Sequence, residues 1–171
     1  LPARSEMCIR DRFQGKTLNT VGDLPAVGQA APEFTTVNTD LEDVTLKDYA
    51  GKRVVLNVFP SIDTGVCAQS VREFNKRAAG LDNTVVVTVS MDLPFALGRF
   101  CGAEGIDNVV ATSAFRSSFG EDYGIKFADG PMKGLMARGV IVIDTDGSVL
   151  YASLTPSVGE EPAYDEILNV L

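Results

Sequence analysis

The sequence contains no histidine among its 171 residues. Imidazole is the base of Ser-His-Asp and Cys-His catalytic pairs, so neither arrangement can exist in this chain. A zinc site of the usual cysteine and histidine kind is also excluded, because the chain has three cysteines and no close pair of them. If a cysteine is activated here, a helix dipole, hydrogen bonds, or an arginine or lysine must do it.

Long apolar runs are also missing, since none approaches the ~20 residues that a membrane helix needs. Positive charge is scarce, with 15 basic against 23 acidic residues and a net charge of −8, which argues against a nucleic-acid partner and an anionic membrane surface. The odd cysteine count and the absence of Cys-x-x-Cys argue against a disulfide-stapled secreted scaffold. Charged residues interrupt any secretory signal at the N-terminus, so we expect a cytoplasmic protein.

The overall composition, with 45% hydrophobic and 22% charged residues, is typical of one globular domain. Residues 1–12 differ from the rest because they show neither strand alternation nor a helical stripe. We therefore predict that 1–12 are an extension, either non-native or disordered, and that 13–171 are the functional domain. Cys8 would then carry no function.

The chain is organised around one strand and the helix that follows it. Val54–Phe59 is a short β-branched run bounded by glycine and proline, which predicts a buried strand. Beyond it Cys67, Val71, Phe74 and Ala78 fall at i, i+4, i+7 and i+11, the spacing of one helix face. The pattern predicts a strand, a tight loop, and a helix with a cysteine in its first turn.

The start of this helix suggests thiol chemistry. Thr64 is a suitable N-cap and would place Cys67 at the third helical position. The unpaired amides of the first turn and the positive end of the helix dipole favour a thiolate over a thiol there. The alternative is that Cys67 is a small core side chain in an ordinary helix.

Other elements follow in a recognisable order. Strand 84–89 lies one helix beyond strand 54–59, which predicts a parallel pair with a right-handed crossover. An α/β thioredoxin-like fold is therefore predicted, with a mixed central sheet flanked by helices and an N-terminal β-hairpin. The remaining predicted elements are that hairpin within 13–25, strands 32–37 and 44–46, an edge strand 109–111, helices 93–101, 115–123 and 160–171, and a hairpin of 139–143 with 148–153.

Two further residues bear on the chemistry. Arg138 opens the C-terminal hairpin, where it is either a solvated strand-edge arginine or a fixed cation beside the thiolate. Cys101 ends a short helix before two glycines, and without other information it is a half-buried core residue.

Several separated motifs resemble one enzyme family. Pro60-x-x-x-Thr64-x-x-Cys67 is similar to the active-site motif of peroxiredoxins. The longer runs 59–67, 92–95, 99–105 and 129–131 resemble the bacterial thiol peroxidases, which are atypical two-cysteine peroxiredoxins. The resemblance extends from about Phe13 to Leu171 and excludes residues 1–12.

This resemblance implies a complete reaction scheme. Cys67 would be the peroxidatic cysteine, Thr64 and Arg138 its activating partners, Pro60 a shield of the pocket, and Cys101 the resolving cysteine. The family reduces hydrogen peroxide and organic hydroperoxides through a sulfenic acid and an intramolecular disulfide, with thioredoxin as reductant. It also implies a homodimer and calls for no cofactor or metal.

Two other functions remain open from the residues alone. One is a thioredoxin-like thiol–disulfide oxidoreductase that does not use peroxide, and the other is a non-catalytic binding module. For the peroxidase we also predict that the reduced protein holds the Cα atoms of Cys67 and Cys101 farther apart than the about 7 Å that a disulfide allows. Segment 94–101 would then have to unfold locally before the bond forms.

Overall fold

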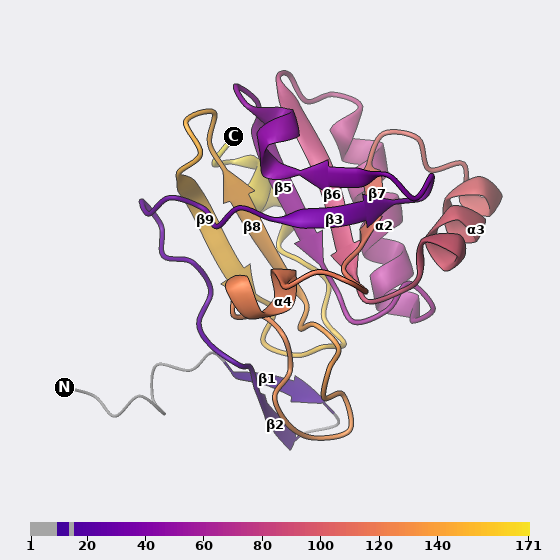
Figure 1. The fold of residues 1–171 in the computed structure, drawn as a ribbon, viewed down its shortest axis with the longest axis vertical. Helices are drawn as coiled ribbons and strands as arrows, with labels where there is room; N and C mark the ends of the chain where they lie inside the picture. Colours follow the sequence, from indigo (N-terminus) through magenta and orange to yellow (C-terminus); the bar gives the residue numbers. More distant parts are fainter. Residues whose placement is uncertain (1–9, 14–15) are drawn as a thin grey trace.

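The computed structural model describes residues 10–13 and 16–171. Seven strands form one mixed sheet in the order β4-β3-β7-β6-β5-β8-β9, as Figure 1 shows. The central strands β5, β6 and β7 run parallel to one another, and the other pairs are antiparallel. The strands are β3 (Thr35–Asn38), β4 (Asp43–Thr45), β5 (Arg53–Val58), β6 (Thr84–Ser90), β7 (Val110–Ser113), β8 (Gly139–Ile143) and β9 (Val149–Leu154).

The predicted strand–helix–strand unit is confirmed. Val54 of β5 pairs with Val85 of β6 in parallel register, and helix α2 (Gly65–Ala78) connects the two strands. The C-terminal hairpin of β8 and β9 is confirmed as well. The thioredoxin-like fold is therefore the one that the sequence predicted.

Strand β7 corrects the prediction of an edge strand at 109–111. It pairs with β6 on one side and with β3 on the other, so it lies inside the sheet. Its polar residues Thr112 and Ser113 are fully buried, and the Thr112 hydroxyl donates to the Thr88 carbonyl at 2.8 Å. The predicted run 109–111 was short and apolar, and the polar residues that extend the strand are buried inside the fold.

Helix lengths also differ from the prediction. Helix α3 (Pro94–Glu104) continues past Gly102 and ends at Gly105, which adopts φ 65°, a conformation that glycine reaches without a Cβ clash. Helices α4 (Phe119–Asp122) and α5 (Tyr164–Leu168) are much shorter than the segments 115–123 and 160–171. A 3-10 helix, η1 (Leu46–Tyr49), follows β4 and was not predicted.

The N-terminal hairpin consists of β1 (Arg10–Phe13) and β2 (Lys16–Asn19), which pair antiparallel from Arg10↔Asn19 to Phe13↔Lys16. Its first strand begins within the segment that we expected to be an extension. Cys8 lies outside the described residues, and the domain boundary at residue 13 stays a prediction.

The sheet carries a different apolar layer on each face. Val54, Leu56 and Val58 of β5 join the larger core with Phe34, Phe119 and other buried side chains. Val55 faces the other way and packs with Phe74 of α2 and Ile167 of α5. This alternation is that of a strand buried on both faces. Among the described residues no helix is long and apolar enough to cross a bilayer.

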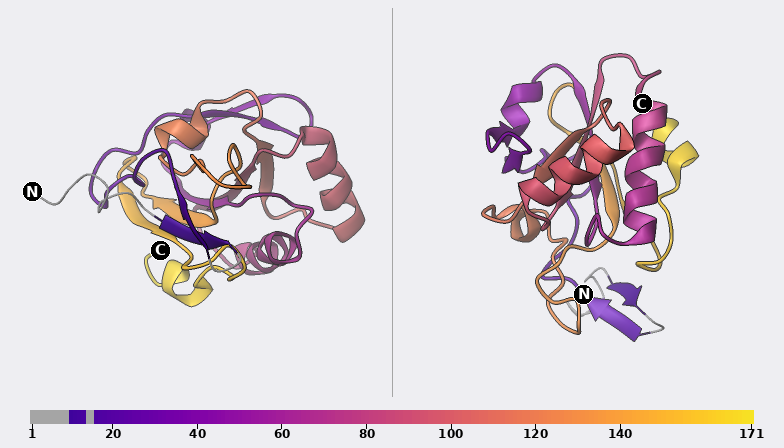
Figure 2. Two further views of the ribbon diagram at one scale, coloured as in Figure 1. Left: turned by 90° about the horizontal axis from the view of Figure 1, so that it is seen from below. Right: turned by 90° about the vertical axis from the view of Figure 1, so that its right-hand side faces the viewer.

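A third cluster lies where α2 and α3 pack side by side, as the right-hand view of Figure 2 shows. It contains Phe59, Ile62, Cys67, Val71, Leu97 and Ala111, with Phe100 and Cys101 packed against it. Both cysteines that the structure describes therefore border the same small apolar cluster.

Candidate active site

The segment that follows β5 places Cys67 in the first turn of α2. Phe59 and Pro60 are buried at the carboxyl end of the strand, and a tight turn brings the chain to Thr64. Thr64 is extended, with φ −103° and ψ 146°, and is the N-cap of the helix. Cys67 is therefore the third helical residue, as predicted, and its side chain is 0% exposed.

Hydrogen bonds fix the turn before the helix. The amide and the hydroxyl of Thr64 both donate to the Ser61 carbonyl, at 3.2 and 3.0 Å. The Thr64 carbonyl accepts the first helical bond from the Ala68 amide at 3.0 Å. In this arrangement the Thr64 hydroxyl has already used its hydrogen, so its oxygen is free to accept a hydrogen bond rather than to donate one.

Arg138 reaches the sulfur from the other side of the fold. It directly precedes β8, and its Nη2 donates to Sγ of Cys67 at 2.9 Å, although 71 positions separate the two residues. Its Nε donates to the Val158 carbonyl at 3.0 Å, which fixes the plane of the guanidinium. Arg138 is 1% exposed, so the alternative of a solvated strand-edge arginine is wrong.

The charge of Arg138 needs compensation in this position. An arginine stays protonated, and a buried guanidinium without an opposite charge is strongly destabilising. None of the ion pairs in the described part of the chain involves Arg138. Among its hydrogen-bond partners only Cys67 can become an anion, so the geometry stabilises the thiolate.

One nitrogen of the Arg138 guanidinium donates no hydrogen bond within the described part of the protein. Nη1 of Arg138 is buried and has no protein partner among the described residues. A buried donor without a partner loses hydration energy, which a bound oxygen atom next to the sulfur would restore. Such a donor is what a peroxide oxygen that gains negative charge requires.

A buried polar pair behind the cysteine was missed by the sequence reasoning. Nδ2 of Asn57 donates to the Ser70 hydroxyl at 3.2 Å, and that hydroxyl donates to the Cys67 carbonyl at 2.8 Å. Both side chains are 0% exposed. The signal was an asparagine inside the apolar run of β5, because a polar residue on a buried strand requires a specific partner.

Cys101 occupies a less constrained position. It is half-buried near the end of α3, its thiol is free, and burial raises its pKa above the ordinary value. Two exposed ion pairs hold α3 near it, each at 3.0 Å: Glu104 pairs with Arg72 of α2, and Arg99 pairs with Asp63 of the turn before α2. Cys67 and Cys101 are both free, so the structure shows the reduced form.

From the sequence we expect Phe59, Ile62, Phe95 and the loop around Met132 and Leu135 to give the pocket mouth an apolar wall, and this wall is only partly present. Phe59 and Ile62 pack in the same cluster as Cys67. Phe95 is 70% exposed at the start of α3. Met132 and Leu135 pack in the larger core on the other face of the sheet, so the loop that contains them does not line this site.

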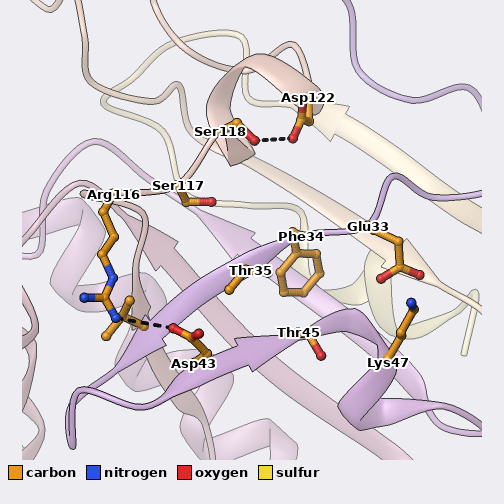
Figure 3. A pocket seen from close by; sticks show the side chains of 11 residues that line it. Glu33, Phe34, Thr35, Asp43, Thr45, Lys47, Arg116, Ser117, Ser118 and Asp122 are labelled. Atoms are coloured by element: carbon orange, nitrogen blue, oxygen red, sulfur yellow. Dashed lines mark hydrogen bonds and ion pairs between the residues drawn. The ribbon is translucent and has the colours of Figure 1, made fainter.

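A separate polar cavity of about 540 Å³ lies beside β3, β4 and residues 116–122 (Figure 3). The Arg116–Asp43 ion pair at 3.3 Å and the Ser118–Asp122 hydrogen bond at 2.6 Å border it. It contains none of the predicted site residues, so its size does not place the chemistry there. No cluster of metal-ligating side chains occurs in the described residues either.

A buried cysteine in the first turn of a helix, bonded to a buried arginine on a thioredoxin-like sheet, defines a thiol-based redox protein. The Redoxin family model matches residues 26–168. A thiol peroxidase of Corynebacterium glutamicum is 56% identical over 162 residues, which cover 95% of this chain and 98% of the relative. The chain belongs to the thiol peroxidases within the Redoxin family and is a peroxiredoxin-type peroxidase.

Other relatives agree with this assignment. A thiol peroxidase of Mycobacterium tuberculosis is 55% identical over 159 residues, or 93% of this chain and 96% of its own. The solved structure of a peroxiredoxin-like protein from Aquifex aeolicus superimposes with a TM-score of 0.90 at 39% identity and covers 94% of each chain. The thiol peroxidase from Chromobacterium violaceum has a TM-score of 0.87 at 20% identity over 95% of each chain, which shows the fold alone.

Proposed function

We propose that this peroxidase reduces hydrogen peroxide and organic hydroperoxides through a sulfenic acid at Cys67 and a disulfide between Cys67 and Cys101. The observation that carries the proposal is the 2.9 Å hydrogen bond from Nη2 of Arg138 to the Cys67 sulfur. It joins a nucleophile to a fixed positive charge inside a site that excludes water.

In the first step the Cys67 thiolate attacks one oxygen of the peroxide. An S–O bond forms, the O–O bond breaks, sulfur is oxidised by two electrons, and hydroxide or alkoxide leaves and takes up a proton. Negative charge builds on both oxygens, so Arg138 Nη1 and the first-turn amides of α2 are the donors that stabilise the transition state. Thr64 accepts from the peroxide O–H, and buried Pro60 keeps bulk water away from the sulfur.

In the second step Cys101 resolves the sulfenic acid. Its thiolate attacks the Cys67 sulfur, an S–S bond forms, the S–O bond breaks, and hydroxide leaves as water with the thiol proton. In the reduced form the two Cα atoms lie beyond disulfide range, so α3 or the first turn of α2 unwinds locally. This distance stays a prediction.

A dithiol protein then restores the reduced enzyme by thiol–disulfide exchange. Thioredoxin is the reductant that the resemblance implies, together with a homodimer. The cytoplasmic location is the one expected from the N-terminal charges and the cysteine usage. The exposed Leu93 and Phe95 beside the site favour peroxides with an apolar group. Organic hydroperoxides should therefore react at least as well as hydrogen peroxide.

The test measures the chemistry at each sulfur separately. Reduced protein is mixed with one equivalent of peroxide, quenched, and analysed by intact mass. The parent should form the Cys67–Cys101 disulfide, and Cys101→Ser should stop at the sulfenic acid. A protein that oxidises no faster than free cysteine would contradict the peroxidase cycle and favour a peroxide-independent thiol–disulfide oxidoreductase.

A further inference from the structure

The carboxylate of Asp92 joins the turn before Cys67 to the segment that leads to Cys101. Asp92 lies between the end of β6 and the start of α3 and is half-buried. It accepts three hydrogen bonds, from the Ser61 hydroxyl at 2.8 Å, the Ile62 amide at 2.7 Å and the Ser90 hydroxyl at 2.7 Å. Two of these donors belong to the turn that leads to Cys67.

The connection continues from Ser61 to the helix cap. The Ser61 carbonyl accepts from both the amide and the hydroxyl of Thr64, and its hydroxyl accepts from the Asp63 amide at 3.2 Å. Asp92, Ser61 and Thr64 therefore form a chain of hydrogen bonds that ends at the N-cap of α2. Displacing the carboxylate would release the residue that sets where Cys67 lies.

The residue after Asp92 begins the other helix. Leu93 is the N-cap of α3, and its carbonyl accepts from the Ala96 and Leu97 amides at 3.0 and 3.2 Å. A second link between the two segments, the Arg99–Asp63 ion pair, has side chains 69% and 66% exposed, so water and salt weaken it. The charge-assisted bonds of the half-buried Asp92 are the stronger link.

We propose that Asp92 is a positioning residue that sets the balance between peroxide capture at Cys67 and disulfide closure to Cys101. This rests on the proposed function of Cys101. While the carboxylate holds the turn, the first turn of α2 keeps the sulfur at Arg138. Disulfide closure requires either that turn or α3 to unwind locally. The hydrogen bonds that Asp92 accepts from Ser61 and Ile62 oppose this movement.

Removing the carboxylate should therefore change the two steps in opposite directions. Asp92→Asn keeps the shape but loses the charge, and its amide nitrogen replaces one of the two oxygen acceptors that the Ser61 hydroxyl and the Ile62 amide use. We expect capture of hydrogen peroxide to slow about tenfold and disulfide closure to speed up by about threefold to tenfold. The fraction converted to sulfinic acid at high peroxide should fall, because closure competes with that reaction.

A matched control exists at the far end of the sheet. Asp146 accepts from the amide and the hydroxyl of Ser148 at 2.9 and 2.6 Å, in the turn between β8 and β9. Asp146→Asn removes a comparable carboxylate and should change neither step. Ser61→Ala removes one donor, leaves Asp92 in place, and should shift both steps in the same directions as Asp92→Asn but less.

The experiment is rapid acid quench after mixing with hydrogen peroxide, followed by thiol alkylation and intact mass, since the chain has no tryptophan to report the steps by fluorescence. Slower capture together with faster closure in Asp92→Asn, with Asp146→Asn unchanged, supports the proposal. Equal changes in both steps, or none, overturn it.

If Asp92→Asn does not fold, Ser61→Ala decides by the same two rates. A parent that forms no Cys67–Cys101 disulfide overturns the proposed function and this role together, whereas a parent that forms it while the variants fail to separate the steps overturns this role alone.

Discussion

The first turn of α2 and the last turns of α3 hold the two described cysteines in opposite ways. Cys67 is fully buried, and its sulfur and its carbonyl are both hydrogen-bonded by buried side chains from other positions in the fold. Cys101 is half-buried, and exposed ion pairs link its helix to α2 and to Asp63 in the turn before α2. Cys67 is therefore held by buried partners, whereas Cys101 lies near the end of a helix that we expect to open at lower cost.

The largest effect should come from changing the cation at Cys67. Arg138→Lys keeps the charge but loses the planar fork that bonds both Sγ and the Val158 carbonyl. We expect the rate constant with hydrogen peroxide to fall by about a hundredfold or more, as for loss of a preorganised donor. Arg116→Lys, in an exposed ion pair with Asp43, is the control and should react like the parent. If Arg138→Lys reacts with peroxide at the parent rate, the assignment of Arg138 to the active site is wrong.

The pH dependence should separate the two cysteines. Burial raises the pKa of the Cys101 thiol, so at neutral pH little of it is the thiolate that attacks. Raising the pH removes that proton, and disulfide closure should speed up by about tenfold per pH unit below that pKa. Peroxide capture does not require the Cys101 proton to leave, so its profile should not follow that of closure. Quenched-flow rates of both steps against pH test this, and parallel profiles would contradict it.

The buried pair behind Cys67 should have an intermediate effect. Ser70→Ala removes the hydroxyl that bonds the Cys67 carbonyl and leaves Nδ2 of Asn57 without its partner. We expect a loss of about 1–3 kcal/mol in the free energy of unfolding, together with slower peroxide capture. Denaturant unfolding measures the free energy of unfolding, and rapid mixing with peroxide followed by acid quench measures the rate of capture.

The matched control for Ser70 is Ser118→Ala, which removes an exposed hydroxyl bonded to Asp122. Its unfolding free energy and its rate should stay close to those of the parent. If Ser70→Ala loses no more stability than Ser118→Ala, then the buried pair does not support the first turn of α2.

The smallest effect should come from the surface of α3. Glu104→Gln breaks the exposed ion pair with Arg72 and loosens the end of the helix next to Cys101. Disulfide closure should speed up by about twofold and respond less to added salt, since exposed pairs contribute little. Glu121→Gln, which breaks the pair with Lys126, is the control. Slower closure in Glu104→Gln would show that the end of α3 does not have to open.

The sequence predicted most of the elements that surround the site. The strand before Pro60, the cap at Thr64 and the position of Cys67 all followed from local signals, because β-branched runs, helical spacing and N-cap preferences act over a few residues. Local signals failed for α4 and α5, which are short and depend on tertiary packing. They failed for β7 because its neighbour β3 lies far away in the sequence.

By itself the sequence determined the kind of chemistry. Without histidine the chain can activate a cysteine only through a helix dipole, hydrogen bonds or a cation, and the strand–loop–helix pattern selected Cys67. Apart from the family resemblance, only the tertiary structure decided which cation lies beside the sulfur. From the residues alone Arg138 is either a solvated strand-edge arginine or a cation beside the thiolate. It reaches Cys67 because antiparallel pairing of β8 with β5 brings the start of one strand beside the end of the other. Such pairing joins residues 71 positions apart, and no local pattern encodes a contact at that separation.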